Sequence, residues 1–167
     1  MRGYNTAILR ELLGKWEEHL SRGKNGPFYP YVAITDTDLR ERGALLDIWP
    51  YIWLLLCKFH LGQCWTNKRK ALKLTSSAKD GDFWKDYVVG QIISLEVQLI
   101  ESMDIQVAHQ LITDQHTNLR ALVNDNPSLR STVDAAISFL EYLTSTWMPE
   151  AFGRVGRSVD EVLHQLH

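Results

Sequence analysis

The stretch that decides the fold is VAITDTDLRERGALLDIWPYIWLLLCKFH, residues 32–60. It opens on a short β-branched run, 31–34, which suits a buried strand and is followed directly by acidic residues. A helical pattern then runs from 39 to about 47 and is closed by a Trp-Pro pair. The next apolar run, 52–56, is too short for a membrane and unbroken enough for a strand buried on both faces. Strand, helix and strand in this order predict a βαβ unit.

Polar side chains follow both predicted strands. Asp36 comes after the first strand, and Cys57 and His60 come after the second. Because ligands of open α/β sheets collect at the carboxyl ends of the strands, we expect these three residues to share one edge of a sheet. The alternative for Asp36 is a structural one, since a carboxylate before a helix is often its N-cap, and Asp38 could do this as readily.

Several separated segments of the chain also match a family. Ile34-Thr35-Asp36, a Trp-Pro pair and Cys57-x-x-His60 resemble the catalytic domain of Mutator-like (MULE) DNA transposases, which has an RNase H-like fold. The fungal branch is the closer likeness, because GYNT at 3–6, CWTNKR at 64–69 and the Tyr-Leu to Trp-Met-Pro segment at 142–149 also resemble it. The resemblance covers roughly residues 3–157.

The resemblance implies a DDE-type site, in which two Asp and one Glu hold two Mg²⁺ or Mn²⁺ ions for DNA cleavage and strand transfer. By resemblance Asp36 is the second acid. The first would lie on an earlier strand and the third in a later helix, and neither is recognisable here. The resemblance therefore implies an internal fragment of a transposase that does not cleave DNA by itself. It also implies DNA as the partner and the nucleus as the location.

The spacing Cys57-x₂-His60-x₃-Cys64 places thiols and an imidazole where they could converge on one helical face, a donor set that suits Zn²⁺. A fourth ligand is not evident, so we favour the alternative of a buried Cys57, a hydrogen-bonded His60 and an incidental Cys64. In the family the Cys-x-x-His pair recurs just after the second acid. It therefore marks the fold even without a metal.

One basic cluster is present, interleaved with a tryptophan at position 65. A phosphate-binding surface beside an aromatic ring would serve DNA binding, while a solvated helix face explains the same run. The candidate DNA-binding residues are Lys58, Lys68, Arg69, Lys70 and Lys73.

Composition sets wider bounds. The chain has 167 residues, 45% of them hydrophobic, and a formal charge of −2, which gives no general attraction to nucleic acid. Two cysteines, no signal-peptide pattern and no apolar run near ~20 residues predict an intracellular protein with no membrane segment.

The rest of the chain is helical in pattern. Apolar residues recur at helical spacing over 8–20, and three further stripes run over 84–103, 108–122 and 133–147, which predict a small bundle. A polar break at 75–81 is the predicted boundary. We expect an α/β plus all-α protein, helix-dominated overall, divided into a partial RNase H-like segment at 1–74, a helical insertion bundle at 82–150 and a divergent tail at 151–167.

Three functional hypotheses follow. The first is a transposase fragment without catalytic competence that binds DNA weakly. The second is a helical module that binds a protein partner or self-associates. The third is an enzyme completed in trans by a chain that supplies the missing acids.

Overall fold

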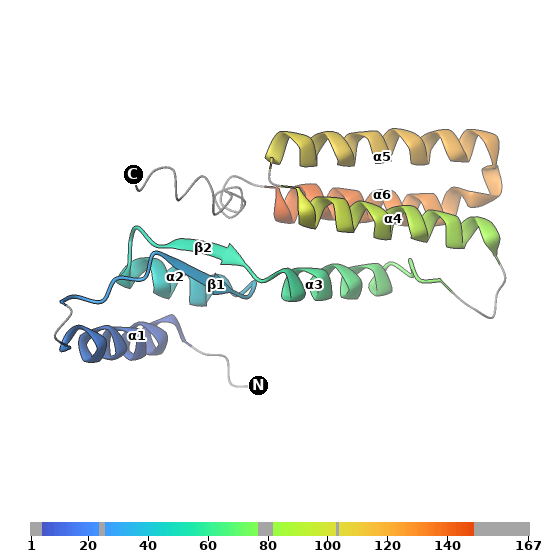
Figure 1. Ribbon diagram of the computed structural model, residues 1–167. Coiled ribbons are helices and arrows are strands. Elements are labelled where there is room, and N and C mark those ends of the chain that lie inside the picture. Colours follow the sequence, from blue (N-terminus) through green and yellow to red (C-terminus); the bar gives the residue numbers. More distant parts are fainter. Residues whose placement is uncertain (1–4, 24–25, 77–81, 103, 149–167) are drawn as a thin grey trace. The chain divides into compact units, whose positions relative to one another are not determined.

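The computed structural model describes residues 5–23, 26–76, 82–102 and 104–148 (Figure 1). The chain divides into two compact units, residues 1–61 and 62–167. The elements of the described residues are, in order, α1 (Thr6–Ser21), β1 (Val32–Thr35), α2 (Leu39–Ile48), β2 (Trp53–Leu56), α3 (Lys58–Ala71), α4 (Phe83–Glu101), α5 (Ile105–Asp125), a 3₁₀ turn η1 (Pro127–Leu129) and α6 (Arg130–Trp147).

The first unit contains the predicted βαβ arrangement. Strands β1 and β2 pair in parallel and in register, from Val32 opposite Trp53 to Thr35 opposite Leu56, with α2 as the connection between them. Within the described residues the sheet has these two strands alone. The coarse α/β prediction is confirmed, while a complete RNase H-like sheet is not seen.

The core of the first unit lies between α1, α2 and one face of the sheet. Trp49 is its centre, and its ring meets those of Trp16 and Phe28 edge to face, each at a centroid distance of 6.1 Å. Such contacts add about 0.5–1.5 kcal/mol to the burial of the rings. The other core residues are Leu45, Ile52 and Leu54, with Leu13, Ala33 and Ile48 packed against them.

The two strands are less buried than predicted, β1 as a buried strand and β2 as a strand buried on both faces. Ile34 of β1 is 69% exposed and Val32 is exposed as well, whereas Ala33 and Thr35 point to the core side. In β2 only Leu54 is buried. The reason is that side chains alternate along a strand, and in this unit the helices cover only one face of the sheet.

Helix α3 ends in a tight turn built on a residue in the left-handed conformation. Lys73 has φ 59°, its N–H donates to the Lys70 carbonyl at 3.0 Å, and the Leu74 N–H donates to the Arg69 carbonyl at 2.9 Å. This is the Schellman arrangement, in which glycine usually occupies the position of Lys73. The turn carries Leu74 back into the core, where it is fully buried.

The second unit is a bundle of helices. Helices α4, α5 and α6 run antiparallel in succession (Figure 1). Each buries a stripe of apolar residues. Most residues of the predicted stripes are buried, but Trp84, at the start of the first stripe, is 42% exposed. Val89, Leu129 and Phe139 are buried as well and were not predicted; position 103 lies outside the described residues. The core positions are Val88, Val89, Ile92, Leu95, Leu99, Ala108, Ile112, Leu119, Leu129, Val133, Ala136, Phe139, Leu140 and Leu143.

Part of α3 also belongs to the second unit. Trp65 is buried and its ring lies 6.4 Å from that of Trp147 on α6. The large apolar ring of Trp65 is removed from water by packing in the core of the bundle. Along the chain, the boundary between the two units falls between Leu61 and Gly62. The boundary that we predicted was the polar break at 75–81. The predicted tail at 151–167 lies outside the described residues.

Two asparagines stand before helical turns and differ in their capping. Asn5 caps α1, because its side chain accepts from the Ala7 N–H at 3.0 Å. Asn126 precedes Pro127, but its side chain makes no capping bond and the turn that follows is 3₁₀. Within the described residues, no helix is both long enough and apolar enough to cross a membrane.

Candidate functional site

The candidate site lies at the carboxyl ends of β1 and β2. The two strands are parallel and in register, so Asp36 and Cys57, the residues that follow them, leave the sheet at the same edge. The Cys57 N–H donates to the Thr35 carbonyl at 2.8 Å, which extends the strand pairing to the start of α3. Asp36 follows β1 and Cys57 follows β2. Because the two strands are parallel, both residues lie at the same end of the sheet.

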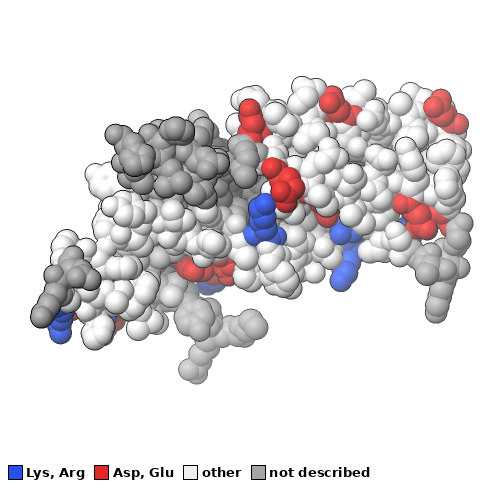
Figure 2. All heavy atoms as spheres, viewed as in Figure 1, with Lys and Arg blue, Asp and Glu red and all other residues white. Residues whose placement is uncertain are grey.

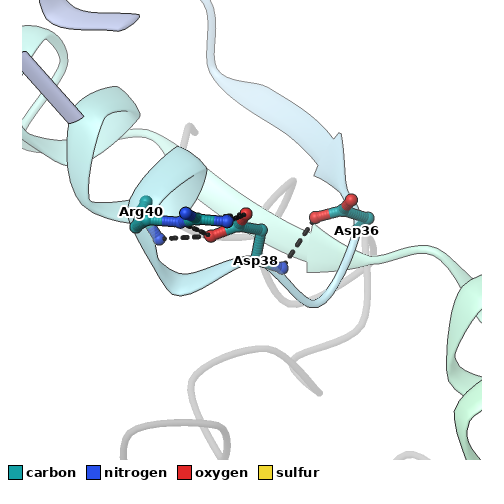
Figure 3. Close-up of polar contacts among 3 residues, drawn as sticks. All are labelled: Asp36, Asp38 and Arg40. Atoms are coloured by element: carbon teal, nitrogen blue, oxygen red, sulfur yellow. Dashed lines mark hydrogen bonds and ion pairs between the residues drawn. The ribbon is translucent and has the colours of Figure 1, made fainter. Parts of the chain in front are cut away.

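Asp36 and Asp38 have different structural roles. The Asp36 carboxylate accepts from the Asp38 N–H at 2.7 Å and closes the turn after β1, while Asp38 accepts from the Arg40 N–H at 2.9 Å and caps α2 (Figure 3). The Arg40 guanidinium also donates to Asp38, and this bond holds the pKa of Asp38 at about 2. The capping role therefore belongs to Asp38. Asp36 stays half-buried at the strand end.

Glu41 completes the acidic group at this edge and was missed in the sequence. Burial raises its pKa, and the neighbouring Asp36 carboxylate with its hydrogen bond to Glu41 raises it further, while His60 opposes the shift. The pKa of Glu41 is therefore raised by its burial and by the carboxylate beside it, and the two acids lie close together at this edge. The available signal was spacing, because Glu41 follows the capping Asp38 by three residues, the N3 position of a capping box.

A buried arginine lies beneath the same edge. Arg42 is enclosed, and its Nη1 donates to the Thr35 hydroxyl at 3.2 Å. Burial lowers the pKa of Arg42, and the carboxyl of Glu41 opposes that shift. The interaction ties α2 to the last residue of β1 and fixes the turn that carries Asp36.

His60 and the cysteines are less closely organised. His60 is exposed in the first turn of α3, where its ring meets that of Phe59 at 5.5 Å, and it is near enough to Glu41 to act on its charge. Cys57 and Cys64 are of intermediate exposure and are not joined in a disulfide. Across residues 5–23, 26–76, 82–102 and 104–148, no group of three or more His, Cys, Asp or Glu is arranged to hold a metal ion. Metal binding by Asp36, Cys57 and His60 therefore stays a prediction.

The predicted basic cluster is divided by the fold. Arg69 turns inward, and its Nε donates to Glu96 at 2.6 Å in an ion pair whose side chains are 11% and 9% exposed. Burial raises the pKa of Glu96, which the guanidinium counteracts. An arginine held in this way has little surface to offer to a phosphate, so the geometry counts against Arg69 as a DNA-binding residue.

The lysines of the cluster remain at the surface in varying degree. Lys58, Lys70 and Lys73 are exposed, and the Nζ of Lys68 lies 4.8 Å from the centre of the Tyr142 ring. Lys58 and Lys68 are ten residues apart on one helix, about 15 Å along its axis. On the face drawn in Figure 2, acidic and basic side chains are interspersed rather than gathered in one large patch.

Comparisons with known proteins add no relative. No family model, no curated protein and no solved structure matches the chain.

Proposed function

We propose that the chain is a segment of the RNase H-like catalytic region of a Mutator-like DNA transposase, in which Asp36 supplies one carboxylate of a two-metal site. The observation that carries the proposal is the parallel β1–α2–β2 unit with Asp36 directly after β1 and Cys57 directly after β2. This arrangement is the one that the family resemblance implies for the second acid and its Cys-x-x-His companion.

The segment does not cleave DNA by itself. Two-metal catalysis requires several anchored oxygens around two cations. Here Asp38 is occupied by the α2 cap and Arg40, and Glu41 shares a hydrogen bond with Asp36. One strand-end carboxylate and one carboxyl with a raised pKa are too few ligands for two Mg²⁺ ions, so activity requires acids from outside this edge.

A nicking assay tests the catalytic part of the proposal. Supercoiled plasmid with Mg²⁺ or Mn²⁺ is expected to stay intact with the wild type, as it does with Asp36→Asn. Mg²⁺-dependent nicking that disappears in Asp36→Asn would show that the chain is an enzyme. Asp47→Asn is the matched control, because Asp47 is an exposed partner of Arg10 on the far end of α2.

Genomic sequence tests the ancestry. The flanking DNA is expected to encode an Asp-bearing strand upstream and a Glu-bearing helix downstream, in this or a shifted reading frame. Their absence from both flanks would remove the support for a transposase origin. If a separate chain carries the missing Asp and Glu, the nicking assay is repeated with both chains mixed. Nicking by the mixture alone would show that the enzyme is completed in trans.

DNA binding by the surface lysines is the part of the proposal that this chain can carry alone. Weak binding should fall steeply with salt, because each lysine–phosphate contact releases a counterion. Lys70→Gln with Lys73→Gln is expected to abolish it, whereas Lys15→Gln, which removes an exposed lysine paired with Glu11 on α1, should leave it unchanged. Equal losses in both variants would point to net charge rather than a site on α3.

A second candidate function, a helical interaction module, is favoured by a different observation. Helix α4 is apolar on the side that faces away from the bundle core as well as on the core side, and Phe83, Tyr87, Ile93 and Val97 are all exposed there. Exposed apolar residues gathered on one side of a helix, here together with Asp86 and Ser94, are a feature of surfaces that bind a protein partner.

A further inference from the structure

The basic cluster of α3 is divided between two environments. Lys70 and Lys73 are exposed, whereas Lys68 and Arg69 lie against helices of the bundle. Because residues three and four apart share a helical face, Lys68 and Arg69 lie on the same side of α3 as the buried Trp65. The packed face of α3 therefore withholds two of the four cations in this run.

The Arg69 guanidinium is held at two points. Its Nε donates to Glu96 of α4 at 2.6 Å, and its Nη2 donates to the Thr66 hydroxyl at 3.3 Å. The low exposure of the ion pair leaves little of the guanidinium open to a further ligand. A DNA phosphate offers the guanidinium the same charged oxygens that a carboxylate does. Glu96 and a phosphate would therefore compete for Arg69.

The ion pair is one that an outside anion can replace. Burial raises the pKa of Glu96 even though the guanidinium acts to lower it, so the loss of hydration at Glu96 outweighs the attraction of Arg69. Taking two charges out of water commonly costs as much as their attraction returns. A ligand that takes Arg69 and leaves Glu96 hydrated removes this cost.

Lys68 is engaged on the same face of α3. Its Nζ lies 4.8 Å from the centre of the Tyr142 ring of α6, which is a cation–π contact. Lys68 keeps part of its side chain in water, so its restraint is the weaker of the two. The contact that most limits the basic cluster is therefore the one between Arg69 and Glu96.

We propose that the ion pair between Glu96 and Arg69 is an autoinhibitory contact, which lowers the affinity of α3 for the phosphate backbone of DNA by occupying Arg69. The inference rests on the DNA binding proposed above for the lysines of α3, and it adds the regulation of that site. Release of Arg69 adds one phosphate contact to those of Lys70 and Lys73. Removal of Glu96 should therefore tighten DNA binding and make it more sensitive to salt.

Four proteins separate the release of Arg69 from a change of net charge. The first is the wild type, and the second, Glu96→Leu, lacks the competing carboxylate. Asp134→Asn removes the same charge from an exposed position of α6. The double variant, Arg69→Met with Glu96→Leu, keeps the net charge of the wild type but has no guanidinium to release.

Fluorescence anisotropy with a short labelled DNA duplex measures binding over a range of salt concentrations. Glu96→Leu is expected to bind at least about fivefold more tightly than the wild type at low salt, and its log–log salt slope should steepen by about 1, the value for one further phosphate contact. Asp134→Asn and the double variant should stay within about twofold of the wild type and keep its slope.

The Nε–H of Arg69 reports on the contact without DNA. Its exchange with water, followed by NMR, should be at least about tenfold faster in Glu96→Leu than in the wild type. Glu96→Gln keeps the size of the side chain and removes its charge. It gives the same test, with a smaller expected gain in DNA affinity, if Glu96→Leu does not fold.

Two results would overturn the inference. One is a Glu96→Leu protein that binds DNA no more tightly than the wild type or than Asp134→Asn. The other is an equal gain in the double variant, because that protein has no Arg69. Failure of the underlying DNA site is recognised separately, since Lys70→Gln with Lys73→Gln would then leave the binding of the wild type unchanged.

Discussion

The two compact units of the chain bury their apolar residues in different ways. Among the large side chains of the described residues that are fully enclosed, the first unit contributes only Trp49, whereas the second contributes ten, among them Trp65 and Phe139. The first unit also exposes Ile34 of β1 and a row on α1 consisting of Ile8, Leu12, Trp16 and Leu20.

The difference follows from how each kind of element satisfies its backbone. A helix makes its hydrogen bonds internally, so three helices can close a core with no further chain. Two strands leave an unpaired edge on each side and, with helices on one face, a bare face on the other. The first unit is therefore expected to depend on additional cover, and the second is expected to be stable on its own.

The largest effect should come from breaking the buried ion pair of the second unit. Arg69→Met leaves Glu96 as an enclosed carboxylate without its partner, which should cost about 4 kcal/mol. Native-state hydrogen exchange of amides in α4 and α6 measures the loss. The double change Arg69→Met with Glu96→Leu should recover most of it, because an apolar pair can replace a buried ionic one.

An ion pair of the first unit gives the matched comparison. Arg10 pairs with Asp47, but both side chains are about half exposed, at 52% and 43%. Arg10→Met should therefore cost less than about 0.5 kcal/mol. Equal losses from Arg10→Met and Arg69→Met would contradict the contrast between the units.

Within the first unit, the two strands should respond unequally. Leu54→Ala removes a buried side chain of β2 and should cost about 2–3 kcal/mol, whereas Ile34→Thr on the bare face should cost less than about 0.5 kcal/mol. Urea unfolding of each variant measures the difference. A cost of about 2 kcal/mol for Ile34→Thr would mean that something covers this face in solution.

The end of α3 offers a smaller, stabilising change. Lys73→Gly should raise the stability of the second unit by about 0.5–1 kcal/mol, because glycine adopts the left-handed conformation without the Cβ penalty. Lys70→Gly, in the last turn of the same helix, is the control and should destabilise by about 1 kcal/mol. A loss in both variants would show that the left-handed turn is not formed.

The smallest effect concerns the cap of α2. The Asp38 carboxyl should titrate at about 2, and Arg40→Gln should move its pKa back toward the ordinary 3.8, because the hydrogen bond from Arg40 is the largest cause of the shift. Because the pKa of Asp38 is lower in the folded chain than its ordinary value of 3.8, the ionised carboxylate stabilises the folded state at higher pH. This contribution should fade as the pH drops from about 4 to 2. Carboxyl chemical shifts measured by NMR against pH test this, and an unchanged pKa in the variant would contradict the assigned cause.

Local patterns predicted the elements of this chain well. Short apolar runs predicted β1 and β2, and apolar residues at helical spacing predicted α1 and the bundle helices, because these patterns are properties of the local sequence.

Features that depend on distant partners could not be predicted. Nothing local distinguishes Arg69 from its lysine neighbours, and only the packing of α3 on α4 brings Glu96 to it. The exposure of Ile34 depends on what covers the sheet, which a β-branched run cannot reveal. Glu41 was overlooked because its importance lies in its approach to Asp36, a contact made by the turn between β1 and α2.

Hydrogen exchange over the whole chain tests the contrast between the units most directly. Amides of α4, α5 and α6 are expected to exchange only by global opening of the bundle, while those of β1, β2 and α2 should exchange at least about a hundredfold faster through local opening. Equal protection of both sets, with one shared free energy of opening, would show that the α/β unit is as self-sufficient as the bundle and would contradict the account.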